Sequence, residues 1–306
     1  MEQTKLTGAE FLRPGLKYGD MNRKSHYLDL GLEPDFIFRI EKCPLTHDFD
    51  VHQHDYSELV VILGGTATHI IEGREYPISA GQVFFIHGNV SHGYKDVDHI
   101  EYVNVMFHPD QMTQLQELKL MAGFQALFYF EPFYRKEMNF KGMLSLNDEQ
   151  LRQVNGLLDV ILDESDQKPE GYRMLIRSYF TALMGVLSRY YVANNGWPQN
   201  KALRIAESIT YLEEHFQEPL NLDMLAERAY LSKRQFLREF ARNFQTTPMD
   251  YVIRRRLDYS CTLLRNPNLS ILQVAQESGF RDQNYYARQF KKIYLCTPTE
   301  YREKYV

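Results

Sequence analysis

Short runs rich in Val, Ile, Phe and Tyr fill the chain between residues 36 and 107. Apolar residues gather at 36–40, 57–63, 67–71, 82–86 and 101–107, and glycine turns are expected at Gly64-Gly65, Gly73 and Gly81. Short strands at this spacing, without helices between them, are typical of an antiparallel sheet. The pattern predicts a small β-barrel or jelly roll.

The period of the apolar positions changes beyond Pro109. From Asn147, a predicted N-cap, one stripe of a helix is expected, made of Leu151, Val154, Leu157, Leu158, Ile161 and Leu162. A second stretch, 175–187, is apolar almost all round, which predicts a buried helix. The stripe can pack on its own barrel, or pair with a second copy as an antiparallel coiled-coil-like dimer. Turn formers at 194–200 predict an interdomain linker.

Beyond residue 200 the sequence repeats itself. At an offset of 49, Leu222, Leu225, Ala226 and Leu231 match Ile271, Val274, Ala275 and Phe280. At an offset of 50, Phe236, Arg238 and Phe240 match Tyr286, Arg288 and Phe290. Each copy has a short helix with an alanine at the packing point, then a tight turn and a second apolar helix. The repeat predicts two helix-turn-helix units.

The second helix of each copy carries polar side chains opposite its apolar positions. Ser232 and Asp282 are the expected caps. Arg can pair with guanine, Asn or Gln with adenine, and Lys with phosphate, each base pair giving about 1–3 kcal/mol of discrimination. The candidate DNA-binding residues are Lys233, Arg234, Arg238, Arg242, Gln283, Asn284, Arg288 and Lys292. An isolated Arg is better interpreted as a solvated surface charge. The matching positions in the two copies favour DNA contact instead.

A predicted helix at 249–264 joins the two units. Sixteen residues span about 24 Å at about 1.5 Å per residue. With the packing offset at either end, the two second helices approach the roughly 34 Å between successive major-groove faces. One chain could then read two grooves of the same duplex.

Charge is divided unequally along the 306 residues, whose net charge is −5. Residues 200–306 carry 17 Lys and Arg against 13 Asp and Glu, whereas residues 1–199 carry 18 against 27. The acidic part is repelled by phosphate, so DNA contact is expected through the C-terminal part. Cys43, Cys261 and Cys296 have no disulfide or zinc spacing. Residues 1–15 lack a signal pattern and no apolar run reaches the roughly 18 residues of a membrane span, so a cytoplasmic protein is expected.

Several motifs of the repeat resemble the AraC/XylS family of transcription regulators. They include Thr247-Pro248-x-x-Tyr251, Ile271-x-x-Val-Ala275, Gly279-Phe280 and Thr297-Pro298-x-Glu-Tyr301. The resemblance covers about 100 residues and implies base readers at Arg234, Arg238, Gln283, Asn284 and Arg288. Leu237 stands where the family often has a polar reader, so the first unit is expected to make fewer base contacts. The resemblance also implies promoter DNA, RNA polymerase and a homodimer as partners, and it favours the dimer among the two roles of the Leu151–Leu162 stripe.

Histidines open the predicted barrel. His52, His54 and Glu58 have even spacing, so on one extended strand their side chains face the same way. With His92 they resemble the His-His-Glu-His site of metal-dependent cupins, a donor set suited to Zn, Fe, Mn or Ni. The second cupin motif is replaced by His87-Gly88-Asn89. Histidines that hydrogen-bond a ligand or each other are preferred here, so no metal and no cofactor is expected.

The same stretch also resembles the sensor barrels of sugar-responsive AraC-type regulators, with residues 47–107 similar to the rhamnose-type activators. On 101–107, the side chains of Tyr102, Asn104 and Met106 share one face. The resemblance places Tyr94, Tyr102 and Asn104 in a sugar pocket, and His54, Glu58 and His69 can join them. Each tyrosine taken singly is equally well explained as core.

The fold class expected is α+β, with a cupin-like β-barrel followed by helices, then an all-α domain of two helix-turn-helix units joined by a linker helix. The expected domains are 1–193 (ligand sensing and dimerisation), 194–200 (linker) and 201–306 (DNA binding). The function expected is a non-enzymatic, sugar-responsive DNA-binding regulator, an activator of carbohydrate-metabolism genes. The alternatives are a metal-dependent cupin enzyme with a C-terminal docking module, and a constitutive DNA-bound protein without an effector.

Overall fold

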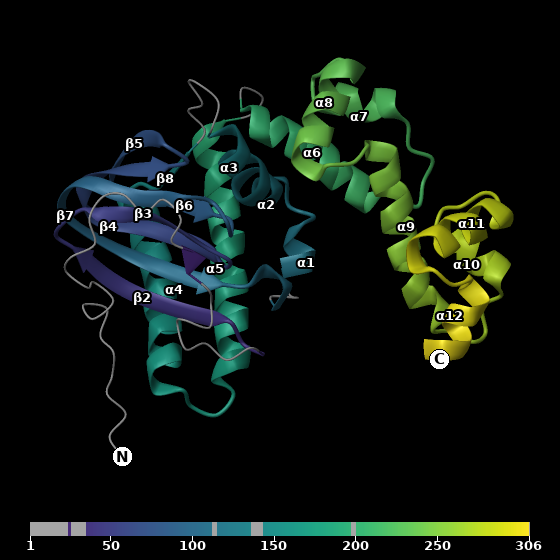
Figure 1. Cartoon of the computed structure of the whole chain (residues 1–306), viewed down its shortest axis with the longest axis horizontal. Helices are drawn as coiled ribbons and strands as arrows, with labels where there is room; N and C mark the ends of the chain where they lie inside the picture. The colour runs from purple at the N-terminus through teal and green to yellow at the C-terminus, as the bar shows by residue number, and fades with distance from the viewer. Residues whose placement is uncertain (1–23, 26–34, 112–114, 136–142, 197–199, 306) are drawn as a thin grey trace. The chain divides into compact units, whose positions relative to one another are not determined.

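The computed structural model describes residues 24–25, 35–111, 115–135, 143–196 and 200–305, and it divides the chain into two compact units (Figure 1). The units are Met1–Ala202 and Leu203–Val306. Residues 1–15, where the sequence lacks a signal pattern, lie outside the described residues, as do 197–199 of the predicted linker.

The first unit is built on a sheet whose two long strands are β4 and β7. The strands are β1 (Lys24–Ser25), β2 (Phe38–Leu45), β3 (Phe49–His54), β4 (Ser57–Ile71), β5 (Arg74–Ser79), β6 (Gln82–Ile86), β7 (His92–Phe107) and β8 (Leu144–Ser145). Their hydrogen-bonded order is β1-β3-β7-β4-β6-β8, with β2 also on β7 and β5 also on β4. The β4–β7 pair is antiparallel from Ser57↔Phe107 to Ile71↔His92.

Two sequence predictions about the strands are wrong. Gly64-Gly65 is not a turn, because β4 runs through it with register shifts against β7 on either side. Gly65 has φ +76°, and a Cβ there would lie 2.2 Å from the carbonyl oxygen of His99, so only glycine fits this bulge. The pattern also missed β5, the first half of β7 and the part of β3 before His52, whose residues do not alternate cleanly between buried and exposed.

The sheet has an aromatic outer face and a more polar inner face. Phe38 and Phe107 are paired across β2 and β7, and both rings pack on Phe180 at centroid distances of 5.5 and 4.8 Å. Tyr102 and Asn104, which alternate with Val103 and Val105, lie on the opposite face with Val60 and Ile62 of β4. The predicted parity of this strand is therefore correct.

Helices follow the strands in the first unit and cover the outer face of the sheet (Figure 1). They are η3 (Pro109–Gln111), α1 (Leu115–Leu118), α2 (Ala122–Gln125), the π-helical η4 (Ala126–Phe130), α3 (Glu131–Tyr134), α4 (Asp148–Gln167) and α5 (Tyr172–Asn195). Asn147 caps α4 in a capping box with Gln150, as predicted. Val154, Leu158 and Ile161 of the stripe are fully buried within the single chain, where α4 packs on α5 and β2.

The second unit is entirely helical. Its helices are α6 (Lys201–Glu214), α7 (Leu222–Arg228), α8 (Lys233–Phe244), α9 (Pro248–Leu264), α10 (Ile271–Glu277), α11 (Gln283–Tyr294) and α12 (Pro298–Tyr305). The pairs α7–α8 and α10–α11 begin 49 and 50 residues apart, the same offsets as in the sequence repeat. Two helix-turn-helix units joined by α9 are therefore present, and the predicted α+β fold class is confirmed.

The repeat extends to backbone conformation. The turn between α7 and α8 contains Tyr230 at φ 53°, and the matching turn contains Gly279 at φ 91°. The C-caps Gln245 and Leu295, 50 positions apart, have φ 53° and 62°. A left-handed residue at the same place in each copy ends or redirects the helix in the same way, although only Gly279 avoids the steric cost.

Candidate functional site

The helices α8 and α11 are oriented by caps and by buried aromatic rings. Ser232 and Gln235 form a capping box, and the Asp282 side chain accepts a hydrogen bond from the Tyr285 backbone N–H at 2.5 Å, so both predicted caps are correct. Phe236 and Phe240 in α8, like Tyr286 and Phe290 in α11, are fully buried. These anchors leave the opposite face of each helix to solvent.

All eight predicted DNA-binding side chains are exposed. They are Lys233, Arg234, Arg238 and Arg242 on α8, and Gln283, Asn284, Arg288 and Lys292 on α11. Guanidinium and amide groups on an accessible helix face match the donor and acceptor pattern of base edges in the major groove. Leu237 is also exposed, at 37%, so the first helix presents an apolar side chain among its polar ones.

Helix α8 also contains a buried acid that the sequence pattern did not indicate. Glu239 is 2% exposed, and its carboxylate lies 3.5 Å from Arg238 and 4.0 Å from Arg242. Lys233 has a carboxylate neighbour too, with its Nζ 2.6 Å from Asp223. These contacts restrain three basic side chains while leaving them exposed. Glu239 was missed because its neighbours in sequence suggest a surface position.

A set of contacts ties the two helix-turn-helix units together. Arg256 of α9 donates hydrogen bonds to the carbonyl oxygens of Phe216 and Glu218, at 2.5 and 2.7 Å. Gln217, between them, donates to the Glu277 carbonyl at the end of α10 at 2.7 Å. Gly279 lies against this loop, and a Cβ there would be 2.6 Å from the Gln217 carbonyl oxygen. The loop at residues 216–218 thereby fixes α9 and the second unit against the first.

The inner face of the sheet holds polar side chains with unpaired atoms. Among the described residues, both ring nitrogens of His69 and Oδ1 of Asn104 are buried without a hydrogen-bond partner. The His69 ring is stacked on Tyr94, with centroids 4.5 Å apart, and Tyr94 and Tyr102 are in contact at 6.0 Å. Burial raises the pKa of both tyrosines, so their hydroxyls remain protonated. Neutral donors and acceptors beside aromatic rings are what binds an uncharged polar ligand.

A histidine cluster lies next to these residues. His52 and His54 stand on β3 and His92 opens β7, whereas Glu58 lies on β4 beyond a bend, so the prediction of one continuous strand is wrong. The four side chains nevertheless converge. Glu58 is 3.5 Å from Nε2 of His54 and 3.3 Å from Nε2 of His92. Burial, then the neighbouring His92, lowers the pKa of His52 to about 4, so this ring is neutral at pH 7.

Strand β2 adds three inward-facing residues that the sequence did not indicate. Arg39, Glu41 and Cys43 alternate along β2 opposite Met106, Asn104 and Tyr102. Arg39 forms an ion pair with Glu41, and burial raises the pKa of the Cys43 thiol to about 11. Their long-range pairing with β7, which no local pattern reveals, brings them to this face.

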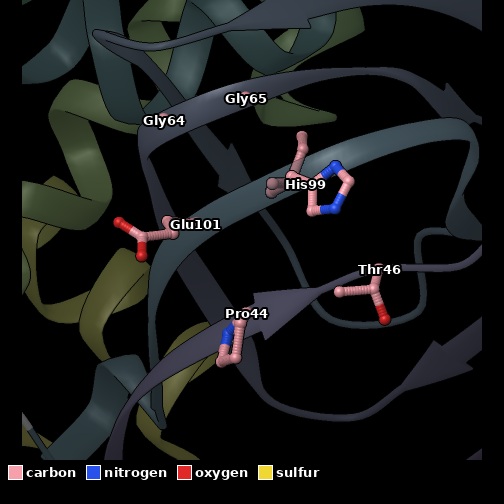
Figure 2. Close-up of a pocket in the computed structure, with 7 residues that line it drawn as sticks. Pro44, Thr46, Gly64, Gly65, His99 and Glu101 are labelled. Carbon is pink, nitrogen blue, oxygen red and sulfur yellow. The ribbon is translucent and has the colours of Figure 1, made fainter.

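A separate shallow cavity of about 270 Å³ lies at the bulge of β4. Figure 2 shows its lining, which includes Pro44 of β2, Thr46 directly after β2, Gly64 and Gly65 of β4, and His99 and Glu101 of β7. None of these residues belongs to the histidine cluster or to the predicted ligand contacts. The cavity is therefore distinct from the polar inner face.

The chain thus joins a β-sheet unit with a polar inner face to a helical unit with two helix-turn-helix pairs, which is the architecture of a ligand-responsive transcription regulator. A family profile described as an AraC-like ligand binding domain matches residues 37–184, and one described as a helix-turn-helix domain matches residues 225–304. The chain belongs to the AraC family of transcription regulators.

Relatives along nearly the whole chain are transcriptional activators. The HTH-type transcriptional activator RhaR of Mannheimia succiniciproducens is 26% identical over 288 residues, covering 90% of this chain and 98% of that protein. RhaS of Enterobacter sp. (strain 638) is 27% identical, covering 83% and 88%. The DNA-binding domain of AdpA, solved in complex with a target DNA, is 30% identical over 33% of this chain and 92% of that chain, with a TM-score of 0.32. No helix within the described residues is long and apolar enough to cross a membrane.

Proposed function

We propose that this regulator activates carbohydrate-metabolism genes when a sugar, or a related small polyhydroxylated molecule, binds to the inner face of its barrel. The observation that carries the proposal is the set of unpaired polar atoms on His69 and Asn104 beside Tyr94 and Tyr102. A buried polar atom without a partner costs about 1–3 kcal/mol, which a ligand hydroxyl at hydrogen-bonding distance would recover. The resemblance of residues 47–107 to the sensor barrels of rhamnose-type activators supports this class of effector.

The proposed effector contacts are His54, Glu58, His69, Tyr94, Tyr102 and Asn104. Aromatic rings can cover the apolar face of a sugar, while histidine, carboxylate and amide groups select its hydroxyls. Each of these six residues is buried or half-buried on the inner face. All six residues fall within residues 37–184, the range that matches the profile described as an AraC-like ligand binding domain.

In the second unit, we propose that Arg234, Arg238, Gln283, Asn284 and Arg288 contact bases. Lys233, Arg242 and Lys292 contact phosphates, since a Lys acts as a point charge and the Arg lies near the end of its helix. The partners proposed are promoter DNA, RNA polymerase and a second copy of this chain. The regulator is proposed to act in the cytoplasm, because that is where the DNA of bacteria such as those of the relatives lies.

A dimer cannot use the buried part of the α4 stripe, because Val154, Leu158 and Ile161 are already covered within one chain. The dimer surface proposed is the outer side of α4, where Gly156 has no neighbour within 4 Å of an added Cβ and Val160 is 39% exposed. Sedimentation of the wild type and of Val160→Glu tests this. A monomeric wild type at micromolar concentration would remove the dimer from the proposal.

The test of the effector is a thermal-shift screen of the full chain against neutral sugars, including deoxyhexoses such as rhamnose. A ligand present at 100 times its Kd stabilises the native state by about 2.7 kcal/mol. His69→Phe and Asn104→Leu should abolish the shift for the active sugar, and His99→Ala, an exposed histidine outside the inner face, should preserve it. Promoter binding that is salt-sensitive and sugar-dependent completes the proposal, and a chain indifferent to every sugar contradicts it.

The second candidate, a metal-dependent enzyme, is favoured by one observation, the convergence of His52, His54, Glu58 and His92. We propose a non-enzymatic regulator instead, because both profiles and the relatives belong to transcription regulators. Incubation of the metal-loaded protein with the sugars that it binds should return them unchanged. Turnover of any bound sugar would reverse the order of the two candidates.

A further inference from the structure

Three imidazole rings on different parts of the sheet meet at one point. His52 and His54 come from β3 and His92 from β7, and one ring nitrogen from each lies within 4.8 Å of the other two. The ring centroids of His52 and His92 are 4.4 Å apart, and those of His54 and His92 are 5.0 Å apart. His54 and His92 are buried and His52 is half-buried. Apolar packing does not explain why three imidazole rings lie together in a buried place.

The orientation of each ring is set by its other nitrogen. Nδ1 of His52 lies 3.1 Å from the Asp50 carbonyl oxygen, Nδ1 of His54 lies 2.7 Å from that of Tyr56, and Nδ1 of His92 lies 3.2 Å from that of Val90. A carbonyl oxygen can only accept, so each Nδ1 carries the proton. In the neutral ring Nε2 then presents a lone pair. In metal sites, a hydrogen bond of this kind from the other ring nitrogen holds a ligating histidine in its orientation.

The lone pairs face an anion. Both oxygens of Glu58 are used, one 3.5 Å from Nε2 of His54 and the other 3.3 Å from Nε2 of His92. Glu58 is 5% exposed, so water does not compensate its charge. An acceptor nitrogen facing a buried carboxylate oxygen is unfavourable unless a cation lies between them. A metal ion would satisfy both, and an extra proton on a ring is the competing explanation.

We infer that His52, His54 and His92, with Glu58, form a binding site for a divalent first-row transition metal ion. Imidazole nitrogen and carboxylate oxygen are the donors that such ions prefer, and Ca²⁺ or Mg²⁺ would require more oxygen ligands. Nitrogens bound tetrahedrally at about 2.0–2.1 Å are roughly 3.4 Å apart. The ring nitrogens, which lie within 4.8 Å of one another, therefore need to approach by at most about 1.4 Å, which side-chain rotation can supply.

The inference deepens the proposed function in one respect, and to that extent rests on it. His54 and Glu58, proposed as effector contacts, would hold the ion, so an effector oxygen would reach them through the metal. His69, Tyr94, Tyr102 and Asn104 remain direct contacts. The site can be tested without any effector, so failure of one idea leaves the other standing.

The experiment uses the untagged full-length chain, stripped with chelator and titrated with Co²⁺, Ni²⁺ and Zn²⁺. One equivalent should remain after dialysis by elemental analysis, and Co²⁺ should give visible d–d bands of nitrogen coordination. His52→Gln and Glu58→Gln should weaken Co²⁺ binding by roughly 100-fold or more, because even a residue that only hydrogen-bonds a metal ligand contributes about 10- to 100-fold. His47→Gln and His99→Gln, which replace exposed histidines, are the matched controls and should bind as the wild type.

A wild-type circular dichroism spectrum and a cooperative thermal unfolding transition show that the barrel of each variant is folded, because promoter contacts belong to the other unit and do not report on it. A stripped wild type that retains no ion, or that binds Co²⁺ no better than His52→Gln, overturns the inference and assigns the cluster to a shared proton. Substoichiometric binding that His47→Gln or His99→Gln removes would also overturn it. Loss of metal in His52→Gln, with the controls unchanged, supports it whether or not a sugar is found.

Discussion

Single side chains on α8 and α11 are expected to divide between reading sequence and holding the backbone. Arg238 can form a bidentate contact with guanine, whereas Lys292, near the end of α11, is placed to neutralise a phosphate. Arg238→Ala should weaken specific binding by roughly 5- to 150-fold, about 1–3 kcal/mol, and relax preference at one base pair. Lys292→Ala should weaken binding to all sequences alike and lower the salt slope by about 1.

The measurement is a salt series on the promoter and on random DNA for both variants. Arg74→Ala, which replaces an exposed arginine on β5 in the other unit, is the matched control. If Arg238→Ala reduces binding to random DNA as much as to the promoter, Arg238 contacts phosphate and is not a reader.

The Cys43 thiol gives a prediction that depends on pH. Its pKa is raised from 9.0 to about 11, first by burial and then by Glu41, so the folded protein holds the proton to a higher pH than the unfolded chain. Between pH 7 and 9 its thiolate fraction should be about 50- to 100-fold lower than in the unfolded chain. Alkylation of Cys43, followed by mass spectrometry, should still rise about tenfold per pH unit through pH 10 in the folded protein.

The same profile in urea should level off near pH 9, and that comparison separates ionisation from mere access. A folded profile that also levels off near pH 9 would show that the thiol is not shielded by β2 and β7. The raised pKa also affects stability. The unfolded chain loses the Cys43 proton near pH 9 and the folded protein only near pH 11, so the free energy of unfolding should fall as pH rises from 9 to 11.

Among the elements, those specified by neighbouring residues could be predicted from the sequence. The caps Asn147, Ser232 and Asp282 were correct because a cap needs only a side chain and the N–H groups two or three residues on. The parity of Tyr102 and Asn104 was correct because alternation is a property of the strand itself. Duplication fixed both helix-turn-helix units because two copies of a weak pattern make a strong one.

Elements that depend on distant partners could not be predicted. Strand β3 has mostly half-buried residues, and its pairing with β7 joins Phe49 to Tyr94. Arg39, Glu41 and Cys43 reach the inner face only through pairing with residues about 60 positions away. The histidine cluster is an intermediate case, since the residue types were evident but a bend between His54 and Glu58 replaced the continuous strand.

The turn of the second helix-turn-helix unit gives a prediction for this element. Gly279 has φ 91°, and alanine there would combine a left-handed backbone with a Cβ 2.6 Å from the Gln217 carbonyl oxygen. Gly279→Ala should destabilise the second helix-turn-helix unit by about 1 kcal/mol or more and loosen its contact with the 216–218 loop. Urea denaturation of the full chain measures this, and promoter affinity should fall with it.

Gly156→Ala is the control of opposite sign. Gly156 lies within α4 and an added Cβ there has nothing within 4 Å, so alanine should stabilise the helix by about 0.5–1 kcal/mol. Equal effects of the two substitutions would mean that the loop yields to the new methyl group, and that it does not fix one unit against the other.

For the whole molecule, the decisive prediction concerns how the two helix-turn-helix units of one chain bind the same DNA duplex. Each unit has its own exposed reading helix, and the contacts of Arg256 and Gln217 hold the units in a fixed relation. Two such helices on one face of B-DNA would meet major grooves one helical turn apart, about 10–10.5 base pairs. Arg238→Ala should therefore remove protection in one groove of the promoter footprint, and Arg288→Ala in the next.

Base-resolution footprinting of the two variants, side by side with Arg74→Ala, makes the comparison. Inserting about five base pairs between the two protected segments should abolish high-affinity binding, because half a helical turn moves the second groove to the far side of the duplex. Retention of full affinity after the insertion, or loss of protection in one and the same groove for both arginines, would mean that the units do not read successive grooves. The basic C-terminal part would then bind through its charge, and sequence preference would have to come from a single helix.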